Sequence, residues 1–269
     1  MVDDEPEVLA GGVANAGAVV RVGAHVLRPA NVHTASIHAL LRHVHAARFD
    51  GANVPVGVES DVEGAARERL VFVPGDVATP PYPAWVQSDD ALASVARLIR
   101  RFHDAARGFD LAGRTWSDEL SDAHGGSIVV HNDVCLENVV FRDGKAVALL
   151  DFDFAAPGRP EFDLAVFAGM CLPMDDPDEA AKLGWQRADR PSRLRLVADA
   201  YGLDAAGRRT FLGLTAERIA RSGEFVRRRV EAGYQNFVTM WNQLGGQERF
   251  DRRRRWWAAE QEQFAAALA

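Results

Sequence analysis

Residues 128–163 form the stretch that most restricts how this chain can fold. Asp143-Gly144 lies near its middle and predicts a two-residue hairpin turn, because both positions of such a turn need a positive φ. Three short apolar, β-branched runs around this turn predict strands: 128–130, 139–141 and 146–150. We therefore expect a compact β unit that presents polar side chains at the ends of its strands.

The polar residues of this unit supply oxygen ligands and a base. Asn138 and Asp151 carry the hard oxygen atoms that Mg²⁺ accepts while it keeps several waters, and Asp153 adds a second carboxylate. Asp133 can accept a proton from a hydroxyl group. No serine or cysteine triad and no glycosidase pair explains the set as well. The alternative is that Asp133 and Asn138 only cap a turn.

The rest of the chain predicts two lobes joined at a proline-rich segment, residues 74–82. Before that segment, short β-branched runs surround one amphipathic helix at 34–48. After it, a helix capped by Ser88 leads to the β unit, and apolar residues recur at helical spacing from about residue 192 onward. We predict a bilobal α+β fold, with a small, mostly β lobe at 1–74 and a larger, mainly helical lobe at 75–269 that contains the catalytic hairpin. The C-terminal helices are expected at 192–201, 205–244 with breaks, and 248–268.

Composition excludes several classes of function. The formal net charge of −7 argues against nucleic acid as a partner. Arginine runs at 227–229 and 252–255 lie on predicted helices beside acidic residues, so we interpret them as solvated helix faces. Two cysteines are too few for a disulfide framework. No run approaches the roughly 20 apolar residues of a membrane span. We expect a cytoplasmic protein that does not enter a membrane.

A glycine-rich turn near the start is a candidate nucleotide loop, with Gly11, Gly12 and Asn15 as its candidate contacts. Glycines let a backbone approach phosphates closely and leave its amides unobstructed. The pattern matches neither GxxxxGK[ST] nor GxGxxG, so an ordinary hairpin turn is the alternative.

The sequence HNDVCLEN followed by LLDFD closely resembles the catalytic and metal loops of the aminoglycoside phosphotransferase and choline kinase family, which has a protein-kinase-like fold. The resemblance implies Asp133 as the base that orients or deprotonates the acceptor hydroxyl, with His131 bracing the loop. It implies Asn138 and Asp151 as Mg²⁺ ligands, with Asp153 assisting. In such an enzyme the metal and positive charge neutralise the transferring phosphoryl group. Asp163, in GRPEFDLA, resembles a family aspartate whose role is mostly structural.

Two departures from the family pattern stand out. Asn132 replaces the usual glycine, and asparagine tolerates unusual backbone angles. No lysine precedes Lys145, although kinases of this fold hold the α and β phosphates with a strand lysine paired to a helix glutamate. Arg28 is the nearest substitute, and His38 stands where the glutamate is expected. Arginine is always charged and can fork onto phosphate oxygens.

These observations favour a small-molecule kinase that transfers the γ-phosphoryl group of ATP or GTP to a hydroxyl acceptor. The alternative is a catalytically impaired, kinase-fold binding or immunity protein that sequesters a small molecule or peptide. A protein kinase is disfavoured because no DFG or APE sequence follows Asp151. The acidic segment 175–179 either attracts an aminated acceptor, such as an aminoglycoside or a cationic peptide antibiotic, or forms a solvated turn. The sequence does not determine the oligomeric state.

Overall fold

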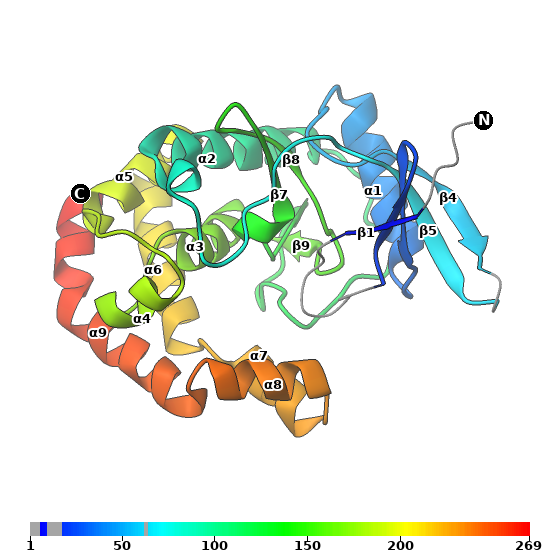
Figure 1. The fold of residues 1–269 in the computed structure, drawn as a ribbon. Coiled ribbons are helices and arrows are strands. Elements are labelled where there is room, and N and C mark those ends of the chain that lie inside the picture. Colours follow the sequence, from blue (N-terminus) through cyan, green and yellow to red (C-terminus); the bar gives the residue numbers. More distant parts are fainter. Residues whose placement is uncertain (1–5, 10–17, 62–63) are drawn as a thin grey trace.

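The computed structural model describes residues 6–9, 18–61 and 64–269. An antiparallel sheet and one helix make up the part near the N-terminus, and helices dominate the rest (Figure 1). The strands are β1 (Glu7–Val8), β2 (Val20–Val22), β3 (His25–Pro29), β4 (Pro55–Ser60), β5 (Ala66–Val71), β6 (Ile128–Val130), β7 (Val139–Arg142), β8 (Lys145–Leu149) and β9 (Ala156–Gly158). The helices are α1 (Thr34–Ala46), α2 (Asp89–Ala105), α3 (Pro160–Cys171), α4 (Pro177–Lys182), α5 (Arg190–Tyr201), α6 (Ala205–Ala220), α7 (Glu224–Glu231), α8 (Gln235–Gln243) and α9 (Gly246–Leu268). This arrangement confirms the predicted bilobal α+β plan.

The N-terminal sheet has the strand order β1-β2-β3-β5-β4, and each neighbouring pair is antiparallel. Strand β3 therefore pairs with β5 rather than with the next strand along the chain. In that pairing Arg28 lies directly opposite Glu68. Residues directly opposite each other in an antiparallel pair share one face of the sheet, so this register places the two side chains together.

Two small antiparallel sheets of two strands each form the predicted β unit. Strands β7 and β8 pair through a turn in which Asp143 has φ 50° and Gly144 has φ 72°, so the turn matches the prediction. Strand β6 pairs with β9, which follows the acidic DFD sequence. The polar loop 131–138 thus starts after β6, in one of these sheets, and leads into β7, in the other.

Residues 72–83 connect the sheet to the helical part without forming a strand or an α-helix. Asp76 and Phe141 exchange two backbone hydrogen bonds of 2.9 and 2.8 Å, which tie this connection to β7. Gly75 has φ 148°, and a Cβ atom there would lie 2.5 Å from the Phe141 carbonyl oxygen. A lobe boundary at residue 74 stays a prediction.

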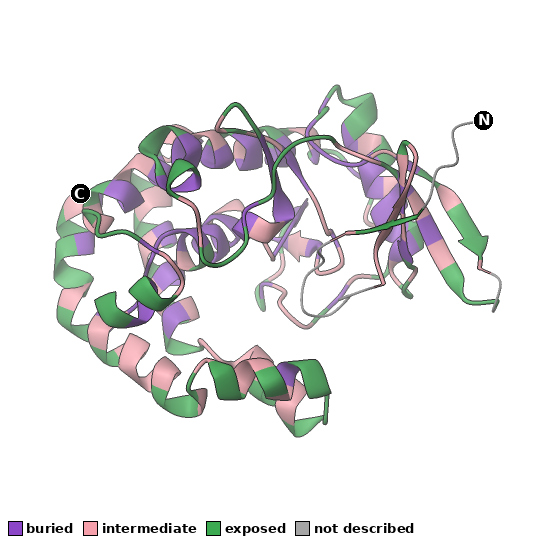
Figure 2. Cartoon of the chain, viewed as in Figure 1, coloured by how far each residue is buried: buried purple, intermediate pink, exposed green. Residues whose placement is uncertain are grey.

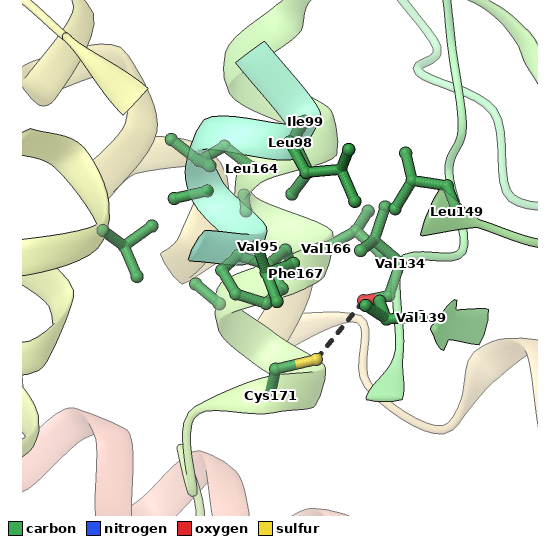
Figure 3. Packing of buried hydrophobic residues seen from close by; sticks show 14 of the residues in the cluster. Val95, Leu98, Ile99, Val134, Val139, Leu149, Leu164, Val166, Phe167 and Cys171 are labelled. Carbon is green, nitrogen blue, oxygen red and sulfur yellow. Dashed lines mark hydrogen bonds between the residues drawn. The ribbon is translucent and has the colours of Figure 1, made fainter. Parts of the chain in front are cut away.

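The largest core lies among the helices that follow this connection (Figure 2). Helix α2 begins as predicted, because the Ser88 hydroxyl accepts the backbone N–H of Ala91. Figure 3 shows residues of α2 packed against α3 and against Val134, Val139 and Leu149 of the β unit. In the same view the Cys171 thiol donates to the Val134 carbonyl oxygen, 3.6 Å away. Both cysteines are free and buried.

The sequence patterns do not predict α3, and they merge α6, α7 and α8 into one broken helix. Gly223 and Gly233 have φ of 90° and 82° and stand at the two breaks. No helix of the described residues is long and apolar enough to cross a membrane.

Two arginines of the run 252–255, which the sequence predicts to be a solvated face, instead hold α9 against the end of α3 and the segment after it. Arg252 pairs with Glu179 at 2.6 Å, and Arg253 donates to the carbonyl oxygens of Met174 and Gly169. These arginines therefore join α9 to the segment that follows α3, because that segment carries buried acceptors.

Candidate active site

The polar loop 131–138 begins with a backbone bend that the sequence accommodates at Asn132. Its φ is 65°, in the left-handed region that asparagine enters more readily than most residues. Its side-chain nitrogen donates to the Phe154 carbonyl oxygen at 2.9 Å. Replacement of the usual glycine is therefore compatible with the loop.

Asp163 holds this bend through hydrogen bonds to its backbone. Its two oxygens accept the backbone N–H groups of His131 at 2.9 Å and Asn132 at 2.8 Å. His103 Nε2 lies 2.9 Å from the same carboxylate, and His103 Nδ1 lies 2.8 Å from the Tyr201 hydroxyl. Burial opposes ionisation of Asp163, but His103 and His131 hold its pKa below the ordinary value. Asp163 thus has the structural contacts that the resemblance implies.

His131 lies inside the loop and is fully buried. Its Nε2 lies 2.8 Å from the Leu150 carbonyl oxygen, and its Nδ1 accepts the backbone N–H of Asp133 at 3.2 Å. Burial lowers the pKa of His131. The neutral ring therefore links the start of the catalytic loop to the end of β8.

Asp133 and Asn138 face each other across the loop. The Asn138 side-chain nitrogen donates to the backbone oxygen of Asp133 at 2.9 Å and to its carboxylate at 3.1 Å. Burial and the charge of Asp151 raise the pKa of Asp133 to about 8. Because Asn138 uses its NH₂ group on Asp133, its side-chain oxygen is the atom left to act as a ligand.

Arg28 reaches across from β3 to the two aspartates that follow β8. Its Nε donates to Glu68 at 2.5 Å, its Nη1 donates to Asp151 at 2.8 Å, and its Nη2 contacts Asp153. Arg28 itself is only 6% exposed. Burial opposes the charge of Arg28, but the three carboxylates raise its pKa further. One guanidinium therefore neutralises part of a three-carboxylate cluster.

Glu68 is the partner that sequence reasoning missed. The sequence places His38 where a helix glutamate is expected, yet His38 contacts Glu68 at 2.7 Å instead of contacting Arg28. Burial works against ionisation of Glu68, while His38 and Arg28 together keep its pKa below the ordinary value. The pairing of β3 with β5 brings Glu68 beside Arg28, and no local sequence pattern predicts that pairing.

The oxygen atoms of this cluster fit Mg²⁺ that is held partly by substrate phosphates better than they fit a metal ion held by side chains alone. Among the described residues no three His, Cys, Asp or Glu side chains form a metal site by themselves. Burial and Asp151 raise the pKa of Asp153 to about 6, which reflects the excess negative charge of the cluster. Mg²⁺ is commonly held by one or two carboxylates together with substrate phosphates. Asp151, Asp153 and the Asn138 oxygen fit that chemistry.

Part of the predicted nucleotide site lies outside the described residues. Gly11, Gly12 and Asn15 belong to that part, so their role stays a prediction.

The acidic segment after α3 combines ion pairs with the turn chemistry that the sequence left open. Asp175 and Glu179 are buried, and they pair with Arg249 and Arg252 of α9. Asp176 caps α4 by accepting the N–H of Asp178. These carboxylates therefore hold helices together, which withdraws them as an attraction for a cationic acceptor.

The sequence does not single out Arg218 of α6, although it lies beside the site. Its guanidinium carbon lies 5.3 Å from the centre of the Phe162 ring, next to Asp163. In the described part of the chain the structure gives it no hydrogen-bond partner. Burial and Arg253 lower the pKa of Arg218 to about 10, while Asp133 acts in the opposite direction. The charge of Arg218 thus acts on the candidate base, Asp133.

Comparison with known proteins adds a family and a fold. A family model described as a phosphotransferase enzyme family matches residues 110–209. The trifolitoxin immunity protein of Rhizobium leguminosarum bv. trifolii is 31% identical over 198 residues, which cover 72% of this chain and 74% of that protein.

Two solved structures resemble the whole chain. One is a choline/ethanolamine kinase family protein from Mesorhizobium loti, with a TM-score of 0.61, 16% identity, and coverage of 98% of this chain and 92% of that one. The other is the GDP complex of aminoglycoside 2'-phosphotransferase-IIIa, with a TM-score of 0.60, 13% identity, and coverage of 94% and 93%. At these identities the likeness is one of fold, and the fold is protein-kinase-like.

Proposed function

This chain belongs to the phosphotransferase family of aminoglycoside phosphotransferases and choline kinases, and we propose that it transfers the γ-phosphoryl group of ATP or GTP to a hydroxyl of a small molecule. The observation that carries the proposal is that Asp133, Asn138 and Asp151 lie at the ends of strands of two small sheets, where Asn138 contacts Asp133 and the charge of Asp151 acts on it. Two free, buried cysteines suit the reducing cytoplasm, which we propose as its location.

Asp133 is the proposed catalytic base. Burial beside Asp151 raises its pKa to about 8, so its carboxylate binds a proton more strongly than an ordinary aspartate. His131 holds the backbone of Asp133 through Nδ1, and Asn138 holds the carboxylate. The loop therefore keeps the base in one orientation toward the acceptor hydroxyl, and positioning is a large part of phosphoryl-transfer catalysis.

Asp151, Asp153 and the side-chain oxygen of Asn138 are the proposed Mg²⁺ ligands. When bound, the metal would neutralise charge on the nucleotide phosphates. Arg28 is the proposed phosphate-binding cation in place of a strand lysine, since its planar fork suits phosphate oxygens. Gly11, Gly12 and Asn15 complete the proposed nucleotide contacts.

The proposed acceptor is an antibiotic or peptide toxin with a free hydroxyl group. The name of the relative, a trifolitoxin immunity protein, supports this class. Since Asp175 and Glu179 are paired with arginines, they lend no support to a cationic acceptor. Aminoglycosides and cationic peptide antibiotics remain members of the panel to be tested.

Purified protein incubated with Mg²⁺, ATP or GTP and that panel should give a phosphorylated product by mass spectrometry. The variants Asp133→Asn and Asp151→Asn should lower the rate by at least about 100-fold, because each removes a group needed for base or metal chemistry. Asp143→Asn is the matched control, since it makes the same change at the exposed turn of the same hairpin. Equal loss of activity in the control would point to misfolding, and unchanged rates in the first two variants would refute the assignment.

A second candidate is an immunity protein that sequesters its ligand without phosphorylating it. The observation in its favour is that Arg28 contacts both metal-site aspartates. Cells that express Asp133→Asn would then stay as resistant to a panel member as cells with the wild type. Loss of resistance together with loss of the phosphorylated product would exclude this candidate.

A further inference from the structure

Arg28 has more negative partners than its single charge can balance. Glu68, Asp151 and Asp153 each contact one of its nitrogens. The side chain of Arg28 is 7% exposed and that of Glu68 is 2% exposed. Three carboxylates share one guanidinium, so Arg28 is the cation that balances part of their negative charge.

The three contacts of Arg28 differ in kind. Glu68 belongs to the same sheet and lies opposite Arg28 in the β3–β5 register, and His38 fixes its second oxygen at 2.7 Å. Asp151 and Asp153 follow β8 in the other lobe, and their side chains are 25% and 20% exposed. The Nε contact is therefore held within the N-terminal sheet, whereas the Nη contacts join that sheet to the segment after β8.

The Nη contacts use the carboxylates that a divalent cation needs. Arg28 contacts the Oδ1 atom of both Asp151 and Asp153. A guanidinium and Mg²⁺ do not readily share these carboxylates, because the two cations repel and compete for the same lone pairs. Nucleotide phosphates can accept the same Nη fork. They would draw it from the aspartates while Nε stays on Glu68.

We propose that Arg28 is the resident cation of the metal site and that Glu68 is its positioning residue. The site therefore takes up a divalent cation only together with a nucleoside triphosphate, whose phosphates replace Asp151 and Asp153 as partners of the Nη atoms. This inference builds on the proposed function and adds a binding order to it. Arginine suits the exchange because its fork keeps one donor anchored while two donors change partners.

The test measures Mn²⁺ binding by electron paramagnetic resonance, without a nucleotide and with the non-hydrolysable analogue AMP-PNP or GMP-PNP. Wild-type protein should bind Mn²⁺ only when the analogue is present. Arg28→Met keeps much of the side-chain length but removes the charge, so it should bind Mn²⁺ alone at least about tenfold more tightly than the wild type. Arg69→Met is the matched control, because Arg69 is a partly exposed arginine next to Glu68 on β5 and pairs with Glu59.

Arg28→Lys keeps the charge without the fork and provides the test if Arg28→Met fails to fold. It should also gain Mn²⁺ binding without nucleotide, by several-fold, since one ammonium group cannot keep all three contacts. Glu68→Gln should weaken analogue binding, and Arg69→Met should leave both affinities unchanged.

Equal binding of free Mn²⁺ by wild type and both Arg28 variants would overturn the exchange and leave the kinase proposal intact. The same holds if every variant needs the analogue equally. Absence of Mn²⁺ binding in the wild type with either analogue would overturn the exchange and the kinase proposal together.

Discussion

Asp163→Asn should destabilise the protein by about 3–5 kcal/mol, because it breaks a buried, charge-assisted set of hydrogen bonds. Asp163 is fully buried, and it accepts the N–H groups of His131 and Asn132 and faces Nε2 of His103. An asparagine has one acceptor oxygen. If that oxygen keeps His131 and His103, its NH₂ group faces the N–H of Asn132, and a buried donor loses its partner.

The magnitude follows from those contacts. An unsatisfied buried donor costs about 1–3 kcal/mol. The two hydrogen bonds that survive lose their charge assistance, at roughly 1 kcal/mol each. Urea unfolding at pH 7, followed by tryptophan fluorescence, measures the difference. Asp50→Asn is the control, because Asp50 forms an exposed pair with Arg101 and should change stability by less than about 1 kcal/mol.

The pH dependence of this difference has a definite sign. The folded-state pKa of Asp163 lies below its unfolded value, which is about 3.9. The stabilisation is therefore complete above about pH 4 and is lost as the pH falls through the folded pKa. The gap between wild type and Asp163→Asn should stay constant from neutral pH to about pH 5 and shrink below about pH 4. A gap below about 1 kcal/mol at pH 7, or one that grows on acidification, would refute the reasoning.

Three further predictions concern other parts of the chain. Gly75→Ala should cost more than about 2 kcal/mol in urea unfolding, because its Cβ would meet a backbone oxygen, whereas Gly64→Ala, with a positive φ in open space, should cost only about 1 kcal/mol. Glu179→Gln should cost about 2 kcal/mol by weakening the docking of α9, while Glu231→Gln, on an exposed helix pair, should cost less than about 0.5 kcal/mol. In an active preparation, Arg218→Gln should move the acidic limb of the pH–rate profile to higher pH. The reason is that the charge of Arg218 lowers the pKa of Asp133, the proposed base, so its removal lets that pKa rise. A shift to lower pH would contradict this.

Local chemistry explains which parts of the fold the sequence predicts. The Asp143-Gly144 turn, the Ser88 cap and the helix predicted at 34–48 each follow from a few neighbouring residues. The structure contains all three, although the helix ends at Ala46. Helix α3 escapes prediction because most of its residues are apolar and buried, so no periodic contrast marks it.

Pairing between distant segments explains what the sequence alone does not reveal. Glu68 becomes the partner of Arg28 only because β5 inserts between β3 and β4 in the sheet. Asp175 and Glu179 lose their apparent role as an acidic rim because α9 returns to pair with them. In both cases a segment distant in the sequence forms an ion pair with the carboxylate, and that pairing decides its role.

The two buried thiols have a practical consequence for labelling. The chain contains only Cys135 and Cys171, and burial raises the pKa of both thiols, so neither should react readily with maleimide dyes. Cysteines introduced at the exposed positions Val58, in the sheet, and Met170, in α3, would then be the reactive pair. Single-molecule energy transfer between dyes at these sites would follow the distance between the lobes in real time.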